Sequence, residues 1–363
     1  MPDILPQRHK GTEKRIRDYG FTPGFLPVGA LNRISDVPGV TVGHLTLREG
    51  DCIRTGVTVI DPGVDDLFHN KLPAAVAVGN GFGKIAGTTQ IDELGTLETP
   101  IALTNTLAVG PVLQGLVELV IRNTPKIPSR VTVNAVVGET CDGVLNDIHD
   151  IVIRPDDVTR AWEYRTADFE LGAVGAGTGT CAFAWKGGIG SASRIVCVDG
   201  KGYTVGAILQ TNFGGALTIM GVPVGALLGK TSFSRFLPSF GDGSCMMVVA
   251  TDAPLSSRQL GRIARRCPLG LARAGSVMGH GSGDYAIALS TNRAGVEGTN
   301  PDRCLPDSAL NPFFLATVEA VEESVYDSMF CAETVTGRDE TTVEQIPVRE
   351  VVEILRKHVV VIP

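Results

Sequence analysis

Residues 240–251 read FGDGSCMMVVAT, a turn of glycine and aspartate that runs directly into an apolar strand. Ser244 is the first residue of that strand, where neighbouring strands would hold its backbone. Gly243 has no Cβ and permits the strained turn that is needed when the Ser244 hydroxyl attacks the preceding carbonyl. Hydrolysis of the resulting ester would leave a terminal serine, whose α-amine has a reference pKa of about 7.7–8 and can act as general base. Taken alone, the same sequence also fits an ordinary turn.

Short apolar runs bounded by turns predict further strands on both sides of this segment. The segment at 199–202 (DGKG) predicts a hairpin, and therefore antiparallel pairing of its two flanking strands. Strands in antiparallel sets, with helices in separate blocks, indicate an α+β sandwich with helices outside stacked sheets. The predicted strands are 40–42, 56–60, 74–78, 131–137, 194–198, 203–209, 244–251 and 285–291, and the predicted helices are 111–123, 256–266 and 311–331.

Composition indicates one large globular domain and excludes several classes of function. In 363 residues, 43% are hydrophobic, and no linker-like stretch or internal repeat divides the chain, so residues 1–363 are expected to form a single domain. The net charge of −7 is spread without a basic stripe, which argues against nucleic acid as a partner. The first residues lack the apolar stretch of a secretory signal, and no apolar run approaches the roughly 18 residues of a membrane span. We therefore expect a cytoplasmic protein that does not associate with membranes.

Cofactor and metal motifs are incomplete. Residues 79–84 (GNGFGK) resemble a phosphate-binding loop, but Val78 and Ile85 stand where that motif requires glycine and Ser or Thr. Residues 175–179 (GAGTG) miss the spacing of a dinucleotide-binding turn. The six histidines show no paired ligand spacing. No cofactor and no metal are expected.

Seven ordered blocks, spread over almost the whole chain, resemble peptidase family S58, which contains the L-aminopeptidase/D-esterase and the β-peptidyl aminopeptidases. The blocks are 32–44 (NRISDVPGVTVGH), 90–106 (QIDELGTLETPIALTNT), 138–148 (GETCDGVLNDI), 175–180 (GAGTGT), 210–215 (QTNFGG), 241–255 (GDGSCMMVVATDAPL) and 280–286 (HGSGDYA).

The resemblance implies a role for each of five residues. Ser244 would be the nucleophile that appears when the chain cleaves itself between Gly243 and Ser244. Asn212 would stabilise the oxyanion with its side-chain amide, and Ser282 and Asp284 would hydrogen-bond around the nucleophile and its amine. Without the resemblance, Asn212 could equally cap a turn, and Ser282 and Asp284 could be loop residues.

Glu139 and Asp142 lie at the end of a predicted strand, where a site for the substrate's α-ammonium group needs a carboxylate. Glu139 is the stronger candidate, and a solvated turn carboxylate is the alternative. Some family members carry an active-site aromatic residue near this segment, whereas Cys141 and Val144 stand at the corresponding positions here.

For the whole chain, the resemblance implies a four-layer α/β/β/α sandwich, similar to the Ntn-hydrolases but with different connectivity. Cleavage would give an α chain of 1–243 and a β chain of 244–363, assembled as a tetramer of αβ units. The substrates would be small peptides, amino-acid amides or esters with a small N-terminal residue: L-Ala, Gly, or D-Ala in esters and amides. The alternatives are a β-peptidyl aminopeptidase, an acyl transferase like the ornithine acetyltransferases, which use Thr where this chain has Ser244, and a non-catalytic binding protein.

Overall fold

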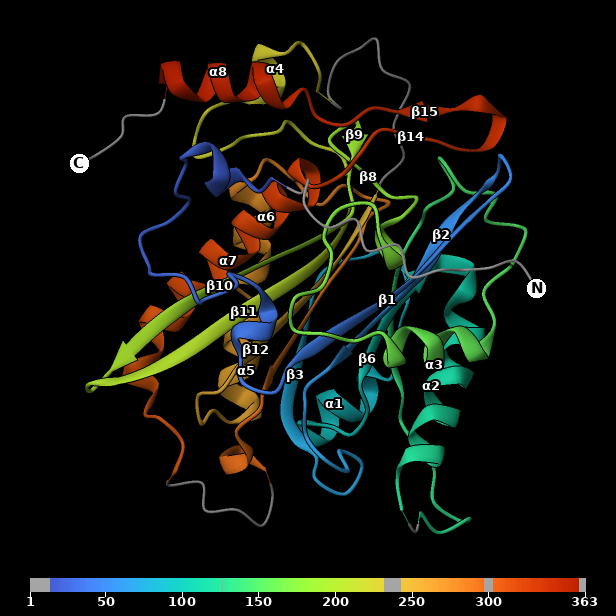
Figure 1. The fold of residues 1–363 in the computed structure, drawn as a ribbon. Helices are drawn as coiled ribbons and strands as arrows, with labels where there is room; N and C mark the ends of the chain where they lie inside the picture. The colour runs from blue at the N-terminus through green and yellow to red at the C-terminus, as the bar shows by residue number, and fades with distance from the viewer. Residues whose placement is uncertain (1–13, 126, 232–242, 297–302, 359–363) are drawn as a thin grey trace.

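Two stacked β-sheets form the centre of the molecule, and helices cover both outer faces (Figure 1). The structure is a computed structural model that describes residues 14–125, 127–231, 243–296 and 303–358. It confirms the expected four-layer α/β/β/α sandwich.

The first sheet has five strands in the order β1 (Thr41–Glu49), β2 (Ile53–Asp61), β6 (Ile101–Asn105), β7 (Val136–Thr140) and β4 (Ile85–Ala86). The second has six in the order β10 (Ile189–Val198), β11 (Lys201–Asn212), β12 (Ser244–Thr251), β13 (Gly283–Ser290), β3 (Leu72–Gly81) and β5 (Thr96–Leu97). Two small ribbons pair β8 (Cys181–Ala182) with β9 (Trp185–Lys186), and β14 (Val335–Thr336) with β15 (Thr342–Val343).

The α-helices are α1 (Thr88–Leu94), α2 (Val109–Asn123), α3 (Pro155–Glu163), α4 (Val224–Leu227), α5 (Ser257–Ala264), α6 (Cys267–Arg273), α7 (Asn311–Phe330) and α8 (Val348–His358). The described 3-10 helices are Ile16–Tyr19, Ile34–Asp36, Thr106–Ala108, Gly175–Gly177, Arg293–Gly295, Asp307–Leu310 and Arg338–Glu340. Helices α2 and α3 lie on the side of the first sheet, and α5, α6 and α7 lie on the side of the second (Figure 1).

β12 is a central strand that is buried on both faces. Met246 and Val248 face the core between the two sheets, whereas Cys245 and Met247 face the core under the helices. A strand covered on both sides has no solvent-facing positions, which explains why 244–251 is apolar throughout instead of alternating.

The predicted elements are found in the structure, several of them with longer bounds than expected, and the prediction for 131–137 is largely wrong. The hairpin at 199–202 joins β10 to β11 in antiparallel register, and β12 begins at Ser244 as expected. The segment 131–137 was expected to be a strand throughout, but 131–135 has no regular structure and β7 begins at Val136. The sheets also contain two parallel pairs, β12 with β13 and β6 with β7.

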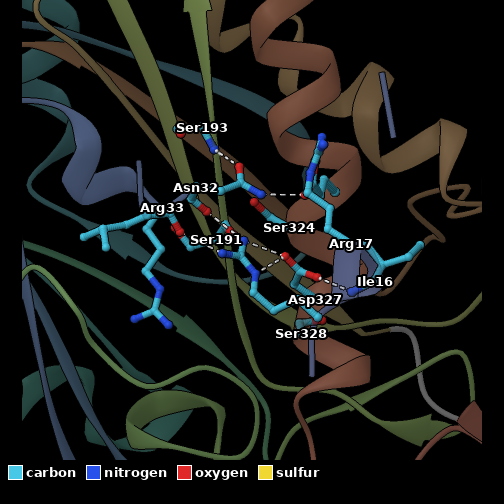
Figure 2. A network of polar contacts seen from close by, with 12 residues as sticks. Ile16, Arg17, Asn32, Arg33, Ser191, Ser193, Ser324, Asp327 and Ser328 are labelled. Atoms are coloured by element: carbon cyan, nitrogen blue, oxygen red, sulfur yellow. Dashed lines mark hydrogen bonds and ion pairs between the residues drawn. The ribbon is translucent and has the colours of Figure 1, made fainter. Parts of the chain in front are cut away.

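The chain before β1 lies as an arm against β10 and α7. Arg15 Nε and the Ile16 N–H both donate to the buried carboxylate of Asp327 on α7, at 2.7 and 3.1 Å. Asn32 accepts from the Ser193 N–H on β10 at 2.9 Å (Figure 2). The arm therefore joins the start of the chain to a helix near its end.

Candidate active site

Ser244 opens β12 between the ends of two neighbouring strands. Its antiparallel partner is Asn212, the last residue of β11, and its parallel partner is Gly283, the first residue of β13. The Gly283 N–H donates to Ser244 Oγ at 3.2 Å, and 6% of Ser244 is exposed. A Cβ on Gly283 would lie 3.2 Å from Ser244 Oγ and 2.9 Å from Gly83 Cα, so a glycine is needed for this close approach. The backbone therefore holds the hydroxyl in one place.

Gly243 packs against the end of β11. A Cβ at this position would overlap the carbonyl oxygen of Asn212 and the Cα of Phe213. The rest of the predicted turn, including Asp242, belongs to 232–242, outside the described residues. The close contact of Gly243 with Asn212 explains why a glycine precedes Ser244, because any side chain at 243 would push the Gly243–Ser244 peptide bond away from Asn212.

The Asn212 amide is held on both sides by backbone groups. Its Oδ1 accepts from the Cys181 N–H at 2.9 Å, and its Nδ2 donates to the Cys141 carbonyl at 2.8 Å. An amide nitrogen carries two hydrogens, so one N–H has no acceptor among the described residues. Asn212 pairs with Ser244 in the sheet, so this donor is on the strand neighbouring Ser244, where the expected oxyanion donor would have to be.

Ser282 and Asp284 are both buried beside the start of β12. The Asp284 side chain is on the helix-facing side of the second sheet with Cys245 and Ala286, whereas Ser244 is on the opposite face. Burial raises the pKa of Asp284 to about 6, against the opposing effects of the nearby Ser282 hydroxyl and the Cys245 N–H. Within the described residues, neither Ser282 Oγ nor either Asp284 carboxylate oxygen has a hydrogen-bond partner of regular geometry. Both groups therefore retain hydrogen-bonding capacity next to the Ser244 backbone.

Glu139, near the end of β7, is connected to the region of Ser244 through the segment that follows β3. Its Oε1 accepts from the Lys84 N–H at 2.8 Å, and its Oε2 accepts from the Thr106 hydroxyl. A Cβ on Gly83 would lie 3.2 Å from Glu139 Oε1 and 3.0 Å from Gly283 Cα. With 2% of its surface exposed, Glu139 is not the solvated turn carboxylate of the alternative interpretation.

Asp142 lies in a different environment. It is buried, and its Oδ1 accepts from Asn146 Nδ2 at 3.1 Å. Burial raises its pKa to about 6, opposed by hydrogen bonds from Thr55, Asn146 and Asn105. Its Oδ2 has no partner of regular geometry within the part of the chain that the structure describes. The hydrogen bonds of Asp142 thus join it to the interior of its own turn and to the start of β2, rather than to Ser244.

The loop at 79–84, set aside in the sequence as an incomplete phosphate loop, contributes to this site. Asn80 Nδ2 donates to the carbonyls of Gly279 and His280, at 3.0 Å each, and to that of Ser282, and the Phe82 N–H donates to the Ser282 carbonyl at 3.1 Å. Asn80 thereby holds the turn before β13. Its signal in the sequence was the glycine-rich turn after a strand, but nothing in that pattern indicates which carbonyls the amide reaches.

In the described ranges, no group of three or more His, Cys, Asp or Glu side chains is arranged to hold a metal ion. No helix among the described residues is long and apolar enough to cross a bilayer.

Comparison with known proteins gives consistent matches over almost the whole chain. The model of peptidase family S58 matches residues 32–343. β-Peptidyl aminopeptidase BapA of Sphingosinicella microcystinivorans is 35% identical over 374 residues, which cover 95% of this chain and 92% of that protein.

Solved structures of similar proteins agree with the match to peptidase family S58. The PH0078 protein of Pyrococcus horikoshii is 43% identical with a TM-score of 0.88, and the match covers 95% of this chain and 99% of that one. The L-aminopeptidase D-Ala-esterase/amidase of Ochrobactrum anthropi, a serine aminopeptidase with a variant of the Ntn-hydrolase fold, is 33% identical with a TM-score of 0.85, covering 95% and 98%. The present fold is therefore Ntn-hydrolase-like.

Proposed function

Because this chain belongs to peptidase family S58 and is a peptidase, we propose that it is a self-processing serine aminopeptidase with Ser244 as its nucleophile. The observation that carries this proposal is the position of Ser244 Oγ. It accepts from the Gly283 N–H at the first residue of a buried strand, directly after a glycine that is packed against Asn212.

Maturation would begin with attack of Ser244 Oγ on the Gly243 carbonyl carbon. The C–N bond then breaks, the amide nitrogen takes up a proton and becomes the α-amine of Ser244, and the α chain is left as an ester on Oγ. Water hydrolyses that ester and gives a carboxylate on Gly243. The two products are an α chain of 1–243 and a β chain of 244–363. They would remain one domain, because β12 pairs with β11 of the α chain and β13 of the β chain.

The mature enzyme would use the same atoms on a substrate. The α-amine takes the hydroxyl proton, Oγ attacks the substrate carbonyl, and the leaving amine or alcohol departs with a proton. The free N–H of Asn212 stabilises the oxyanion, while Ser282 and Asp284 supply hydrogen bonds to the new amine. Water then releases the amino acid from the acyl-enzyme.

Glu139 would confine the enzyme to substrates with a free amino group. Its carboxylate is buried close to Gly83 and Gly283, so a substrate ammonium bound there lies next to the nucleophile. Asp142 remains the second candidate for this anchor. Small N-terminal residues, L-Ala or Gly, with D-Ala in esters and amides, are the proposed acyl groups. A β-amino acid is the alternative, favoured by the β-peptidyl aminopeptidase relative.

The assembly is proposed to be a tetramer of αβ units that acts on small peptides, amides and esters. Mass measurement of the native protein by light scattering tests the tetramer. A stable mass equal to one αβ unit would exclude it.

The substrate assay compares L-alanyl, glycyl, β-alanyl and N-acetyl-alanyl p-nitroanilides. We expect rapid release from at least one free-amine substrate and at least about a 100-fold loss on acetylation, because the acetylated substrate leaves the anchor carboxylate unpaired. Glu139→Gln should raise KM for the free-amine substrate by about 10-fold or more, because a hydrogen bond between charged groups contributes roughly 1.5–3 kcal/mol. The β-alanyl rate decides between the α- and β-amino acid alternatives.

Ser244→Ala is the control for contaminating peptidases. Equal rates of p-nitroaniline release from free and acetylated alanyl substrates would contradict both the proposed carboxylate anchor and the assignment as an aminopeptidase.

A further inference from the structure

Lys186, on β9, is a fully buried cation with no carboxylate bound to it among the described residues. Its exposed fraction is 0%, and its Nζ donates to the carbonyls of Gly177, Thr180 and Gly187 at 3.0, 2.8 and 2.8 Å. An ammonium group has three N–H donors, so all of them are used. All three acceptors belong to one short segment, 177–187, which is therefore wrapped around the ammonium group.

That segment leads directly to the amide proposed to stabilise the oxyanion. The Thr180 hydroxyl donates to the Gly177 carbonyl at 3.1 Å, and the next residue, Cys181, donates its N–H to Asn212 Oδ1 at 2.9 Å. The Cys181 N–H fixes which end of the Asn212 amide faces the Cys141 carbonyl, and hence where the remaining Nδ2–H points.

The β8–β9 hairpin at 181–186 is also attached to the residue after Asn212. Phe183 donates its N–H to the Phe213 carbonyl at 2.8 Å, and the two rings pack edge to face with centroids 5.1 Å apart. Phe183 and Ala184 have φ of 51° and 68°, in a region that normally favours glycine. Residues in this strained conformation persist only where the surroundings hold them.

Burial also disfavours the charge of Lys186. It lowers the pKa to about 7, which the charges of Cys181, Glu333 and Asp142 oppose and that of Arg48 reinforces. A buried charge is costly to desolvate unless it is paired and hydrogen-bonded, and here only the hydrogen bonds are present among the described residues. Stability of the core therefore does not explain a lysine at this position. The turn that its ammonium group holds explains it better.

We propose that Lys186 is a positioning residue for acyl transfer, whose ammonium group holds the 177–181 turn so that the Cys181 N–H orients the Asn212 amide. This inference rests on the proposed function. Without the ammonium group, the Gly177 carbonyl would keep only the Thr180 hydroxyl at 3.1 Å, and the Thr180 carbonyl would keep only the Gly187 N–H at 3.2 Å. The turn would then hold the amide less firmly in the orientation that serves the oxyanion.

The test is the kcat and KM of mature Lys186→Met, normalised to the mature fraction measured by intact mass. We expect kcat to fall about 10- to 100-fold, with KM changed less than about threefold, since the oxyanion interaction belongs to the transition state. Arg15→Met is the matched control, because Arg15 also donates to three main-chain carbonyls, those of Leu31, Asn32 and Ser191, but in the N-terminal arm. It should retain wild-type kcat.

The pH profile distinguishes positioning from a general loss of stability. Deprotonated Lys186 has two N–H donors for three carbonyls, so wild-type kcat should show an alkaline limb that is absent in Lys186→Met. The acid limb, from the terminal amine, should remain in both. If Lys186→Met does not mature, Lys186→Arg provides the same test. Arginine stays protonated at alkaline pH, so the alkaline limb of the kcat–pH profile should be absent in this variant.

Two outcomes would overturn the proposal. In the first, the matured Lys186 variants have the same kcat and the same alkaline limb as the wild type. In the second, Arg15→Met loses as much kcat as Lys186→Met. Failure of the proposed function would look different, since wild-type protein would then show no Ser244-dependent release of p-nitroaniline.

Discussion

At the scale of single residues, the proposed chemistry depends on the Asn212 N–H that has no carbonyl acceptor within the described part of the chain. Asn212→Ala should lower kcat by about 10²–10³ with a smaller effect on KM, the usual result of removing one oxyanion donor. The measurement is kcat and KM on an alanyl or β-alanyl p-nitroanilide, per mature site. Asn212→Asp is the companion variant: it keeps the acceptor for the Cys181 N–H but loses both N–H donors and adds a negative charge, so kcat should fall at least as far as in Asn212→Ala. Wild-type turnover by matured Asn212→Ala would exclude Asn212 from the mechanism.

Asp142 gives a prediction about stability and pH. Its pKa is about 6 in the folded protein and 3.8 for an ordinary Asp. Between these values the unfolded chain has released the proton and the folded protein has not, so stability falls as pH rises from about 4 to 6. The Asp142→Asn variant does not titrate at this site. The free energy of unfolding of the variant, relative to that of the wild type, should therefore rise by about 2–3 kcal/mol between pH 4 and 6.

Urea unfolding of Asp142→Asn and wild type at pH 4, 5, 6 and 7 measures this difference. Unchanged kcat and KM in Asp142→Asn would assign Asp142 a structural role, whereas a large rise in KM would make it part of the substrate anchor. A stability difference that does not vary with pH would contradict the assigned pKa.

At the scale of elements, the junction between 243 and β12 depends on a glycine. Gly243→Ala should slow self-cleavage by about tenfold or more, because its Cβ would overlap the Asn212 carbonyl and shift the scissile bond away from the amide. Gly202→Ala in β11 is the matched control, since a Cβ there meets nothing within 4 Å. Gel electrophoresis after timed expression measures the cleaved fraction. Equal fractions in both variants would show that the junction is not constrained as described.

The elements show what sequence patterns can and cannot predict. β12 and α2 were predictable because local apolar patterns mark them. The apolar spacing of 311–331 predicted a helix with one buried face, but α7 also buries Glu319, Glu323 and Asp327. Their burial depends on arginines that are distant in the sequence, so no local pattern carries it. Likewise, 131–135 has strand-like composition, but only the segment from Val136 pairs with β6.

The site divides in the same way. Ser244, Asn212, Ser282 and Asp284 were predicted from the resemblance, and Glu139 from its place at the end of a predicted strand. The structure brings all five to neighbouring strand ends. Asn80, Thr106 and Lys186 were missed, since their contacts are largely with backbone carbonyls or with residues remote in sequence. Backbone groups have no residue identity, so sequence alone does not reveal such partners.

At the scale of the whole molecule, buried ion pairs join the two proposed chains. Arg194 on β10 donates to Glu319 and Glu323 on α7 at 2.9 and 2.7 Å, with all three side chains fully buried. Asn32 adds a bond to Glu323 at 2.6 Å, close to the contacts of the arm in Figure 2. The α and β chains should therefore stay associated after cleavage.

Arg194→Met tests this association. It removes the guanidinium bound to Glu319 and Glu323, although Glu323 keeps Arg17 at 2.6 and 2.8 Å. Loss of this buried ion pair should destabilise the protein by about 3–5 kcal/mol. Thermal unfolding measures the loss, and chromatography in moderate urea should separate the α and β chains at a lower concentration than for wild type. An unchanged unfolding midpoint would show that the N-terminal arm and the remaining contacts hold the two chains together without the ion pairs of Arg194.

The central claim is that Ser244 becomes an N-terminal nucleophile. The most direct measurement is the intact mass of denatured wild-type protein beside that of Ser244→Ala. We predict two species from the wild type, with the masses of 1–243 and 244–363, and one full-length species from Ser244→Ala. A single full-length wild-type species, or cleavage of Ser244→Ala at the same bond, would contradict the account.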